Sequence, residues 1–215
     1  MYDIKNIITY GSYWTYRTYG SYNNIVQHDK LVIDIETKNT FADVGGQDKL
    51  LDLEMSFVGV YSYNQDEYFG FFENEFEKLA PILKNTDLII GFSSNRFDIP
   101  ILNKYYNFNV KAIESLDILE EIEEKLGHRI KLDHLAMTNL KVGKTAQGLE
   151  AIKFYNEKRW DDLKNYCLND VKITRELYDL GKKQGHLLVP TDHGRSIAKV
   201  EFDWNEKIPL GNFLF

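Results

Sequence analysis

The chain has 215 residues, 43% of them hydrophobic and 27% charged, which fits one globular domain with a sizeable core. It has neither an apolar run of roughly 18 residues nor a basic segment before an apolar block, so the sequence predicts no membrane span and no secretory signal. The single cysteine, Cys167, excludes an internal disulfide and indicates a cytoplasmic location, and the net charge of −7 argues against a surface that coats nucleic acid broadly.

Residues 1–29 form a Tyr-rich extension without aliphatic periodicity. Tyrosine recurs at every third position, which matches neither the helical nor the strand period, at Tyr10, Tyr13, Tyr16, Tyr19 and Tyr22. We expect a poorly ordered or surface-draped segment. An alternative is a set of rings that stack on unpaired bases, with Arg17 contacting phosphate.

The following segments predict an α/β domain with a mixed sheet. Strands are expected at residues 31–37, 55–63, 67–72, 87–91 and 112–117, the second and third joined as a hairpin. Helices are expected at 73–84, 97–106, 118–126, 132–140 and about 159–180, with loops over 38–53 and before the last helix. Gly181 is expected to stop that long helix. Residues 183–215 are expected to form a β-hairpin, from strands at 186–190 and 198–204, and a tail packed on the same domain.

Two acids lie at the end of the strand predicted at residues 31–37. Side chains two apart share one face of a strand, so Asp34 and Glu36 point one way and Ile33 and Ile35 point the other. The residues before them are apolar on both faces, as in a central strand covered on both sides. Buried carboxylates need compensation, and a hard cation with oxygen ligands supplies it. The alternative is an ordinary strand end whose acids reach solvent.

Two further segments place acids at the ends of core elements. Asp98 follows the strand predicted at 87–91 and begins a helix, where its alternative role is to cap that helix. Tyr166 and Asp170 are four residues apart on the long helix, and their face continues with Ile173 and Leu177. This is the core-facing stripe of an amphipathic helix, so Asp170 is expected to point inward, where an acid needs a partner.

Three weaker patterns are set aside. Asp52-Leu53-Glu54 repeats the Asp-x-Glu spacing, but it follows no β run and is interpreted as surface. Residues 143–145 read Gly-Lys-Thr, yet a phosphate-binding loop would need glycine where Thr138 stands, and no strand precedes it. Cys167 lies in the middle of a helix without a basic neighbour, which favours core packing over nucleophilic catalysis.

These acids, in this order and spacing along the chain, resemble those of the DEDD superfamily of 3′–5′ exonucleases. A tyrosine lies four residues before the last acid, and in this the chain resembles the tyrosine branch of the superfamily, DEDDy. The resemblance rests on these motifs: Asp34-x-Glu36, Phe97-Asp98 and Tyr166-x-x-x-Asp170.

Residues 91–102 and 166–170 resemble the second and third motifs of the exonuclease domains of family-B DNA polymerases and of their stand-alone YprB-type relatives. The resemblance covers about residues 30–182, the predicted exonuclease domain. Ser93 stands where the polymerase relatives usually have asparagine, a departure that bears on affinity for the terminal nucleotide and on base or sugar preference.

The resemblance implies a ribonuclease-H-like mixed five-stranded sheet flanked by helices. It also implies two divalent cations, Mg²⁺ or Mn²⁺, held by Asp34, Glu36, Asp98 and Asp170. Tyr166 would orient the attacking water, and the products would be nucleoside 5′-monophosphates. Substrate contacts are expected from Thr37, Ser93, Asn95, Phe97 and Lys144, with Arg96 and Lys141 as further candidates for phosphate contacts.

The resemblance therefore implies a metal-dependent exonuclease acting on single-stranded 3′ ends of DNA or RNA. An exoribonuclease of the same superfamily and a ribonuclease-H-like module that binds nucleic acid without cutting remain alternatives. Whether the domain works alone or beside a helicase or polymerase is left open by the sequence.

Overall fold

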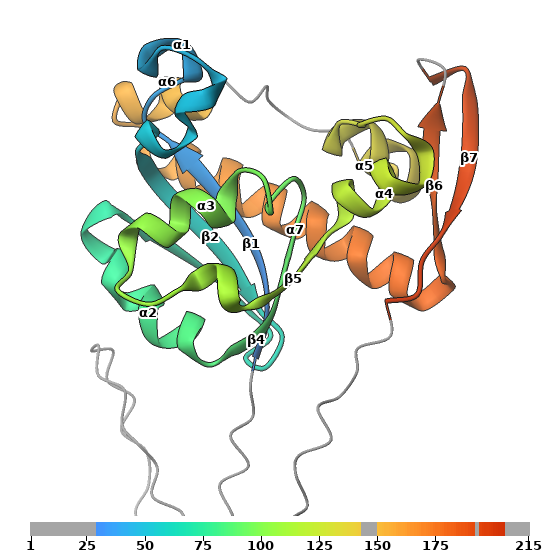
Figure 1. The fold of residues 1–215 in the computed structure, drawn as a ribbon, viewed down its shortest axis with the longest axis horizontal. Coiled ribbons are helices and arrows are strands. Elements are labelled where there is room, and N and C mark those ends of the chain that lie inside the picture. The colour runs from blue at the N-terminus through green and yellow to red at the C-terminus, as the bar shows by residue number, and fades with distance from the viewer. Residues whose placement is uncertain (1–28, 143–149, 192–193, 205–215) are drawn as a thin grey trace, which may run out of the picture.

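The computed structural model describes residues 29–142, 150–191 and 194–204. At its centre lies a five-stranded sheet in the order β3-β2-β1-β4-β5 (Figure 1). The strands are β1 (Asp29–Thr37), β2 (Met55–Ser62), β3 (Glu67–Phe72), β4 (Thr86–Gly91) and β5 (Glu114–Asp117). β1, β2 and β3 pair antiparallel, whereas β4 is parallel to β1 and β5 is parallel to β4. The mixed five-stranded sheet predicted from the sequence is confirmed.

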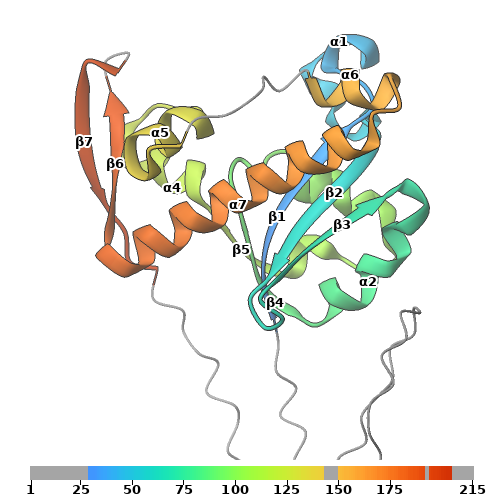
Figure 2. The ribbon, with the colours of Figure 1, turned by 180° about the vertical axis from the view of Figure 1, so that it is seen from behind.

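β1 is the middle strand, and helices cover both of its faces. The helices α2 (Phe76–Lys84) and α3 (Asp98–Leu102) lie on one face, and α7 (Trp160–Gln184) crosses the other diagonally (Figure 2). Ile33 and Ile35 pack into the core on the side of α2 and α3. Because side chains alternate along a strand, Asp34 and Glu36 point to the face covered by α7.

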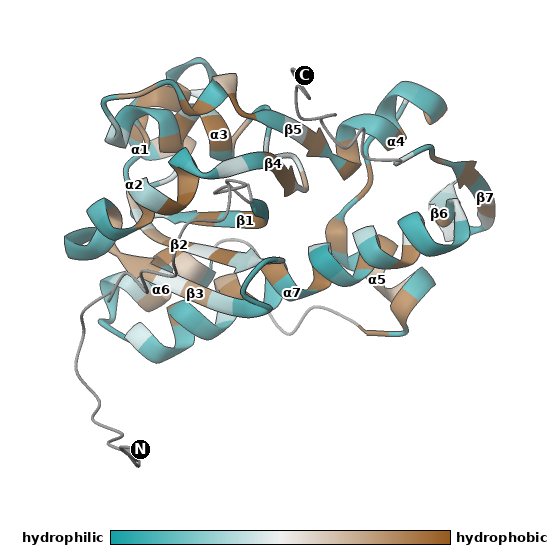
Figure 3. Ribbon diagram, turned by 90° about the horizontal axis from the view of Figure 1, so that it is seen from below, coloured by the Kyte–Doolittle hydropathy of each residue, from teal (hydrophilic) through white to brown (hydrophobic). Residues whose placement is uncertain are grey.

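The remaining elements gather at the two ends of α7. The helix α6 (Glu150–Asn156) lies near its start (Figure 1). At its far end lie α4 (Ile118–Leu126), α5 (Leu132–Leu140) and the antiparallel hairpin of β6 (His186–Thr191) and β7 (Ser196–Glu201). The Asn139 side chain ties α5 to β6, since it bonds to both the N–H and the C=O of Leu188 at 2.9 and 2.7 Å. Much of the outer surface of α4 and α7 is hydrophilic (Figure 3).

The predicted end of the long helix is wrong by four residues. The helix runs to Gln184, and Gly185 takes the left-handed conformation (φ 73°) that ends it. Gly181 remains helical, and a Cβ there would lie 2.3 Å from a ring carbon of Trp204. This glycine is therefore needed for close packing rather than for a turn.

Two segments expected to be loops contain helices, and β7 is shifted. Residues 38–53 include the single-turn helix α1 (Phe41–Val44), which begins with a capping box between Thr40 and Asp43, and a 3₁₀ segment at Gln47–Asp52. α6 is also a helix, with Ala151 buried. β7 begins at Ser196 and ends at Glu201, because Phe202 and Trp204 leave the ladder and enter the core beside α7. None of the helices within the described ranges is long and apolar enough to cross a membrane.

Candidate active site

The candidate site lies where β1 extends beyond β4. β1 pairs with β2 as far as Thr37 but with β4 only as far as Val32. The next segment of its other edge is therefore not covered by a strand. There the backbone N–H of Ile35 donates to the Asp98 carboxylate, with an N–O distance of 2.9 Å. Asp98 takes the place of a strand partner and is held against β1.

Asp98 is the first residue of α3 and is 5% exposed. The sequence left open whether it caps its own helix, and the structure places its carboxylate across on β1. Burial raises the pKa of Asp98 to about 7, hydrogen bonds to backbone N–H groups oppose this, and the negative charges of Asp117 and Asp170 add to it. Asp98 is thus a buried carboxyl close to other acids, the environment in which a cation favours ionisation.

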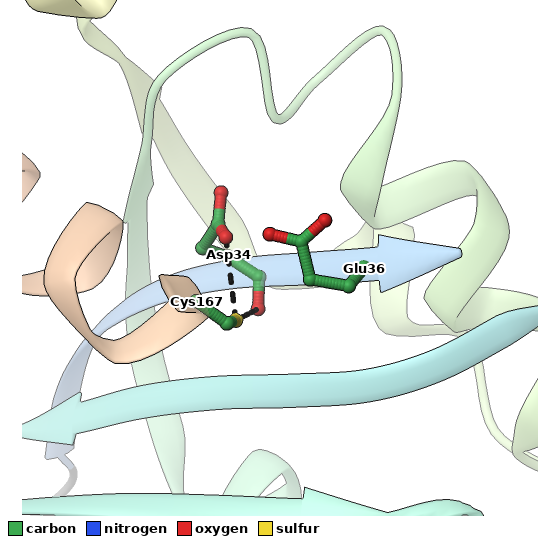
Figure 4. Close-up of side chains that lie close together, drawn as sticks. All are labelled: Asp34, Glu36 and Cys167. Atoms are coloured by element: carbon green, nitrogen blue, oxygen red, sulfur yellow. Dashed lines mark hydrogen bonds between the residues drawn. The ribbon is translucent and has the colours of Figure 1, made fainter. Parts of the chain in front are cut away.

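Asp34 and Glu36 present their carboxylates side by side from the same face of β1 (Figure 4). Ligand atoms of these two residues and the sulfur of Cys167 all lie within 4.8 Å of one another. Cys167, on α7, donates to the Oδ2 and to the backbone oxygen of Asp34, each at 3.3 Å. The thiol therefore packs against the base of the carboxylate pair.

The pKa of Cys167 is influenced by three of the predicted acids. Burial raises the pKa of the thiol, and the negative charges of Asp34, Glu36 and Asp170 raise it further. A protonated thiol is a poor ligand for hard cations, whereas carboxylates suit Mg²⁺ and Mn²⁺. The donor set that fits these ions is therefore the carboxylates, with Cys167 as a packing residue.

Tyr166 and Asp170 lie one turn apart on α7, and both are buried. Tyr166 packs with Phe57 of β2, and its ring meets that of Phe154 edge-on at 6.2 Å. Asp170 influences the pKa of Asp98 on one side and that of Cys167 on the other. The charge of Asp170 thus acts both on Asp98 and on the thiol that packs against Asp34.

The loop that precedes Asp98 is anchored by a residue that the sequence did not single out. Asp117 accepts hydrogen bonds from the backbone N–H groups of Ser93 (2.8 Å) and Asn95 (3.0 Å). It also caps α4 by accepting from Leu119 and Glu120. Aspartate directly before an apolar helix is a cap signal, so the capping role of Asp117 could be predicted from the sequence. Its hydrogen bonds to a distant loop could not.

The predicted substrate-contacting side chains are partly engaged within the protein. Ser93 has a left-handed backbone (φ 68°), and its hydroxyl accepts from Arg129 at 2.7 Å. Asn95 donates to Glu120 at 2.5 Å. Phe97 packs edge-on against Phe41, and the Thr37 hydroxyl donates to the Asn39 carbonyl at 2.9 Å.

Lys144 lies outside the described residues, as does the Gly-Lys-Thr pattern at 143–145. Arg96 pairs with Glu123 at 2.7 Å, and Arg129 shares that carboxylate at 3.3 Å. The sequence did not single out Arg129, since no local pattern marks a side chain that reaches a loop 36 residues earlier.

We expect the contribution of Asp98 to the stability of the metal-free protein to be lost as the pH rises from about 4 to about 7. The pKa of Asp98 is raised in the folded state to about 7 from an ordinary value of 3.8, so the folded state holds a proton that the unfolded state releases. That stabilisation is complete below pH 4 and is lost through pH 7, at up to about 1.4 kcal/mol per pH unit. Urea unfolding in EDTA at several pH values measures it. Asp98→Asn should flatten the slope, whereas the exposed control Asp52→Asn should retain it; equal slopes in both variants would contradict the assignment.

Comparisons with known proteins agree with this architecture. Residues 31–181 match the RNase_H superfamily. Among solved structures, the family B DNA polymerase from the hyperthermophilic archaeon Pyrobaculum calidifontis is similar, with a TM-score of 0.53 and 19% identity over 72% of this chain. The match spans 24% of the polymerase chain, and at this identity it supports the fold. A search of curated protein sequences finds no match. With the family match covering more than half of its length, the chain belongs to the RNase_H superfamily and has a ribonuclease-H-like fold.

Proposed function

We propose that this protein is a divalent-metal-dependent 3′–5′ exonuclease that releases nucleoside 5′-monophosphates from single-stranded DNA or RNA. The observation that carries the proposal is the hydrogen bond that holds the Asp98 carboxylate against the backbone of β1 at Ile35, between Asp34 and Glu36. The charge of Asp170 acts on Asp98 and on Cys167, which contacts Asp34. The family and the fold similarity to a DNA polymerase make a nuclease the favoured class of enzyme.

In this proposal, Asp34, Glu36, Asp98 and Asp170 hold two Mg²⁺ or Mn²⁺ ions through carboxylate oxygens. Such cations, when bound, acidify water and stabilise charge on the attacking and leaving oxygens of phosphoryl transfer. The bond from Ile35 fixes the position of the Asp98 carboxylate before the substrate arrives. Cys167 limits the movement of Asp34 by the two contacts that it makes with it.

Tyr166 is the residue assigned to orienting the attacking water. It lies one helical turn before Asp170, and its ring is held by packing with Phe57 and Phe154. A ring fixed in this way restricts the directions in which its hydroxyl can point, which suits a positioning role.

The test uses single-stranded DNA and RNA of one sequence, labelled at the 5′ end, with Mg²⁺ or Mn²⁺. We expect a ladder of products that shorten from the 3′ end, together with nucleoside 5′-monophosphates. Faster decay of the RNA would assign the alternative of an exoribonuclease. Binding without degradation on both strands would instead indicate a non-cleaving module and overturn the proposal.

A further inference from the structure

A pocket of about 480 Å³ lies beside the end of β1, and none of the four predicted metal ligands lines it. This size lies within the range of small-molecule sites in proteins. Its lining comes from β2, from the end of β3 and the segment that follows it, and from α6 and the start of α7. The residues that matter for its chemistry are Ser56, Phe72, Glu73, Asn74, Tyr155 and Trp160.

The pocket adjoins the candidate active site through two short connections. Ser56 is the extra residue of a β-bulge, because Glu36 pairs with Phe57 and the next residue, Thr37, pairs with Met55. Phe57 packs in the same cluster as Tyr166. On the other wall, the pocket residue Tyr155 directly follows Phe154, whose ring touches that of Tyr166.

The walls of the pocket are aromatic, and one ring is well placed for stacking. Trp160 meets Phe72 edge-on at 6.0 Å and Tyr155 edge-on at 5.6 Å, so its ring is held from two sides. Its side chain is nevertheless 43% exposed. A fixed indole with an accessible surface can stack on a flat ring at little entropic cost.

The polar groups in the pocket favour a neutral ligand with hydrogen-bonding edges. Ser56 is 1% exposed, and within the described part of the chain its hydroxyl has no hydrogen-bond partner. A buried hydroxyl of this kind gains from a partner supplied by a ligand. Asn74 adds a side-chain amide to the lining.

The charge of the pocket disfavours phosphate. Glu73 and Glu75 both line it. Among the residues that the structure describes, the Lys38 ammonium is paired with Glu73 at 2.7 Å and with Glu54 at 3.1 Å, and the Lys78 ammonium is paired with Glu75 at 2.8 Å. Glu73 also accepts from the Tyr155 hydroxyl at 2.7 Å. A phosphate would meet carboxylates here, whereas the amino group of a base would find acceptors.

We propose that this pocket is a subsite that binds one unpaired nucleobase of the strand being degraded, by stacking on Trp160 and hydrogen bonding to Ser56. The inference rests on the proposed exonuclease function and specifies where a base near the cleaved end would lie. The phosphates of the strand would lie outside this pocket.

Steady-state degradation of single-stranded DNA with Mn²⁺ tests the subsite. Stacking on one ring contributes about 1–3 kcal/mol, so Trp160→Ala should raise KM by about 5- to 150-fold and leave kcat near that of the wild type. Trp160→Phe keeps an aromatic ring and should raise KM much less. Ser56→Ala removes a hydroxyl that has no partner in the described structure, so it should fold normally while raising KM by about 2- to 12-fold. An unchanged KM in both Trp160→Ala and Ser56→Ala would overturn the proposal.

An abasic scan identifies the base and separates the two proposals. In the wild type, removal of the base at one particular position, counted from the 3′ end, should raise KM as much as Trp160→Ala does. In Trp160→Ala, removal of the base at that position should leave KM unchanged. Equal sensitivity of wild type and variant at every position would exclude the subsite. If no degradation occurs at all, the exonuclease proposal fails. Quenching of tryptophan fluorescence by the oligonucleotide then tests separately whether the pocket binds a base. Quenching that persists in Trp160→Phe would exclude the subsite in that case.

Discussion

Replacing Asp34 by alanine, or Asp170 by asparagine, is expected to abolish Mg²⁺-dependent degradation of single-stranded nucleic acid without unfolding the protein. Each change removes a carboxylate from the proposed cation site. Loss of a residue that only supports a metal ligand typically lowers metal affinity or activity about 10- to 100-fold. Loss of a ligand itself should therefore lower the rate at least about 10³-fold. The rate of nucleotide release at saturating substrate measures the effect.

Both variants should fold because the acids repel one another when no cation is bound. Asp170 raises the pKa of Asp98 by its charge, so asparagine at position 170 removes a repulsion while keeping the shape of the side chain. Urea unfolding in EDTA should therefore give stability close to or above that of the wild type.

The chain provides a matched control. Asp52-Leu53-Glu54 has the same Asp-x-Glu spacing as Asp34-x-Glu36, but Asp52 and Glu54 are exposed, and Glu54 is paired with Lys38 at 3.1 Å. Asp52→Asn should leave the rate unchanged. Degradation that survives in both Asp34→Ala and Asp170→Asn would show that the acids at the end of β1 are not the source of the activity.

Tyr166→Phe is expected to lower kcat by about 10²- to 10³-fold while leaving KM nearly unchanged. A group that positions or polarises the attacking water contributes to the transition state rather than to substrate binding. Phenylalanine keeps the ring and hence its packing against Phe57 and Phe154, so the loss is assignable to the hydroxyl.

Tyr106→Phe is the control for removal of a tyrosine hydroxyl. The Tyr106 hydroxyl donates to the backbone oxygen of Phe76 at 2.9 Å, on the α2 side of the sheet. We expect this variant to lose about 1 kcal/mol of stability and no activity. A Tyr166→Phe enzyme with the kcat of the wild type would remove Tyr166 from the mechanism.

The central strand and the sheet type were predictable because their signals are local. The run before Asp34 is apolar on both faces, and the structure buries Leu31, Val32 and Ile33 almost completely. The spacing of Asp34 and Glu36 placed them on one face, and the four-residue spacing of Tyr166 and Asp170 placed them on the inner face of a helix.

The orientation of Asp98 could not be predicted from its own neighbours. Aspartate at the start of a helix ordinarily reads as a cap, and the local sequence does not reveal that β1 extends past β4. Only the folded sheet leaves the Ile35 N–H available for the Asp98 carboxylate.

Close packing likewise overrode the local signals at two other places. Gly181 reads as a helix stop, but it is the contact with Trp204 that requires glycine. α6 is only seven residues long, too short to be marked by periodicity, and it is stabilised by contacts with α7 and with β1. The pocket at Trp160 depends on this helix, so it too was not predictable.

Anomalous diffraction from crystals grown with Mn²⁺ tests most directly whether the carboxylates of residues 34, 36, 98 and 170 form one cation site. We expect strong manganese peaks at the end of β1, coordinated by carboxylate oxygens from β1, α3 and α7. Manganese bound elsewhere, or bound there without any contact to Asp98 and Asp170, would contradict this expectation.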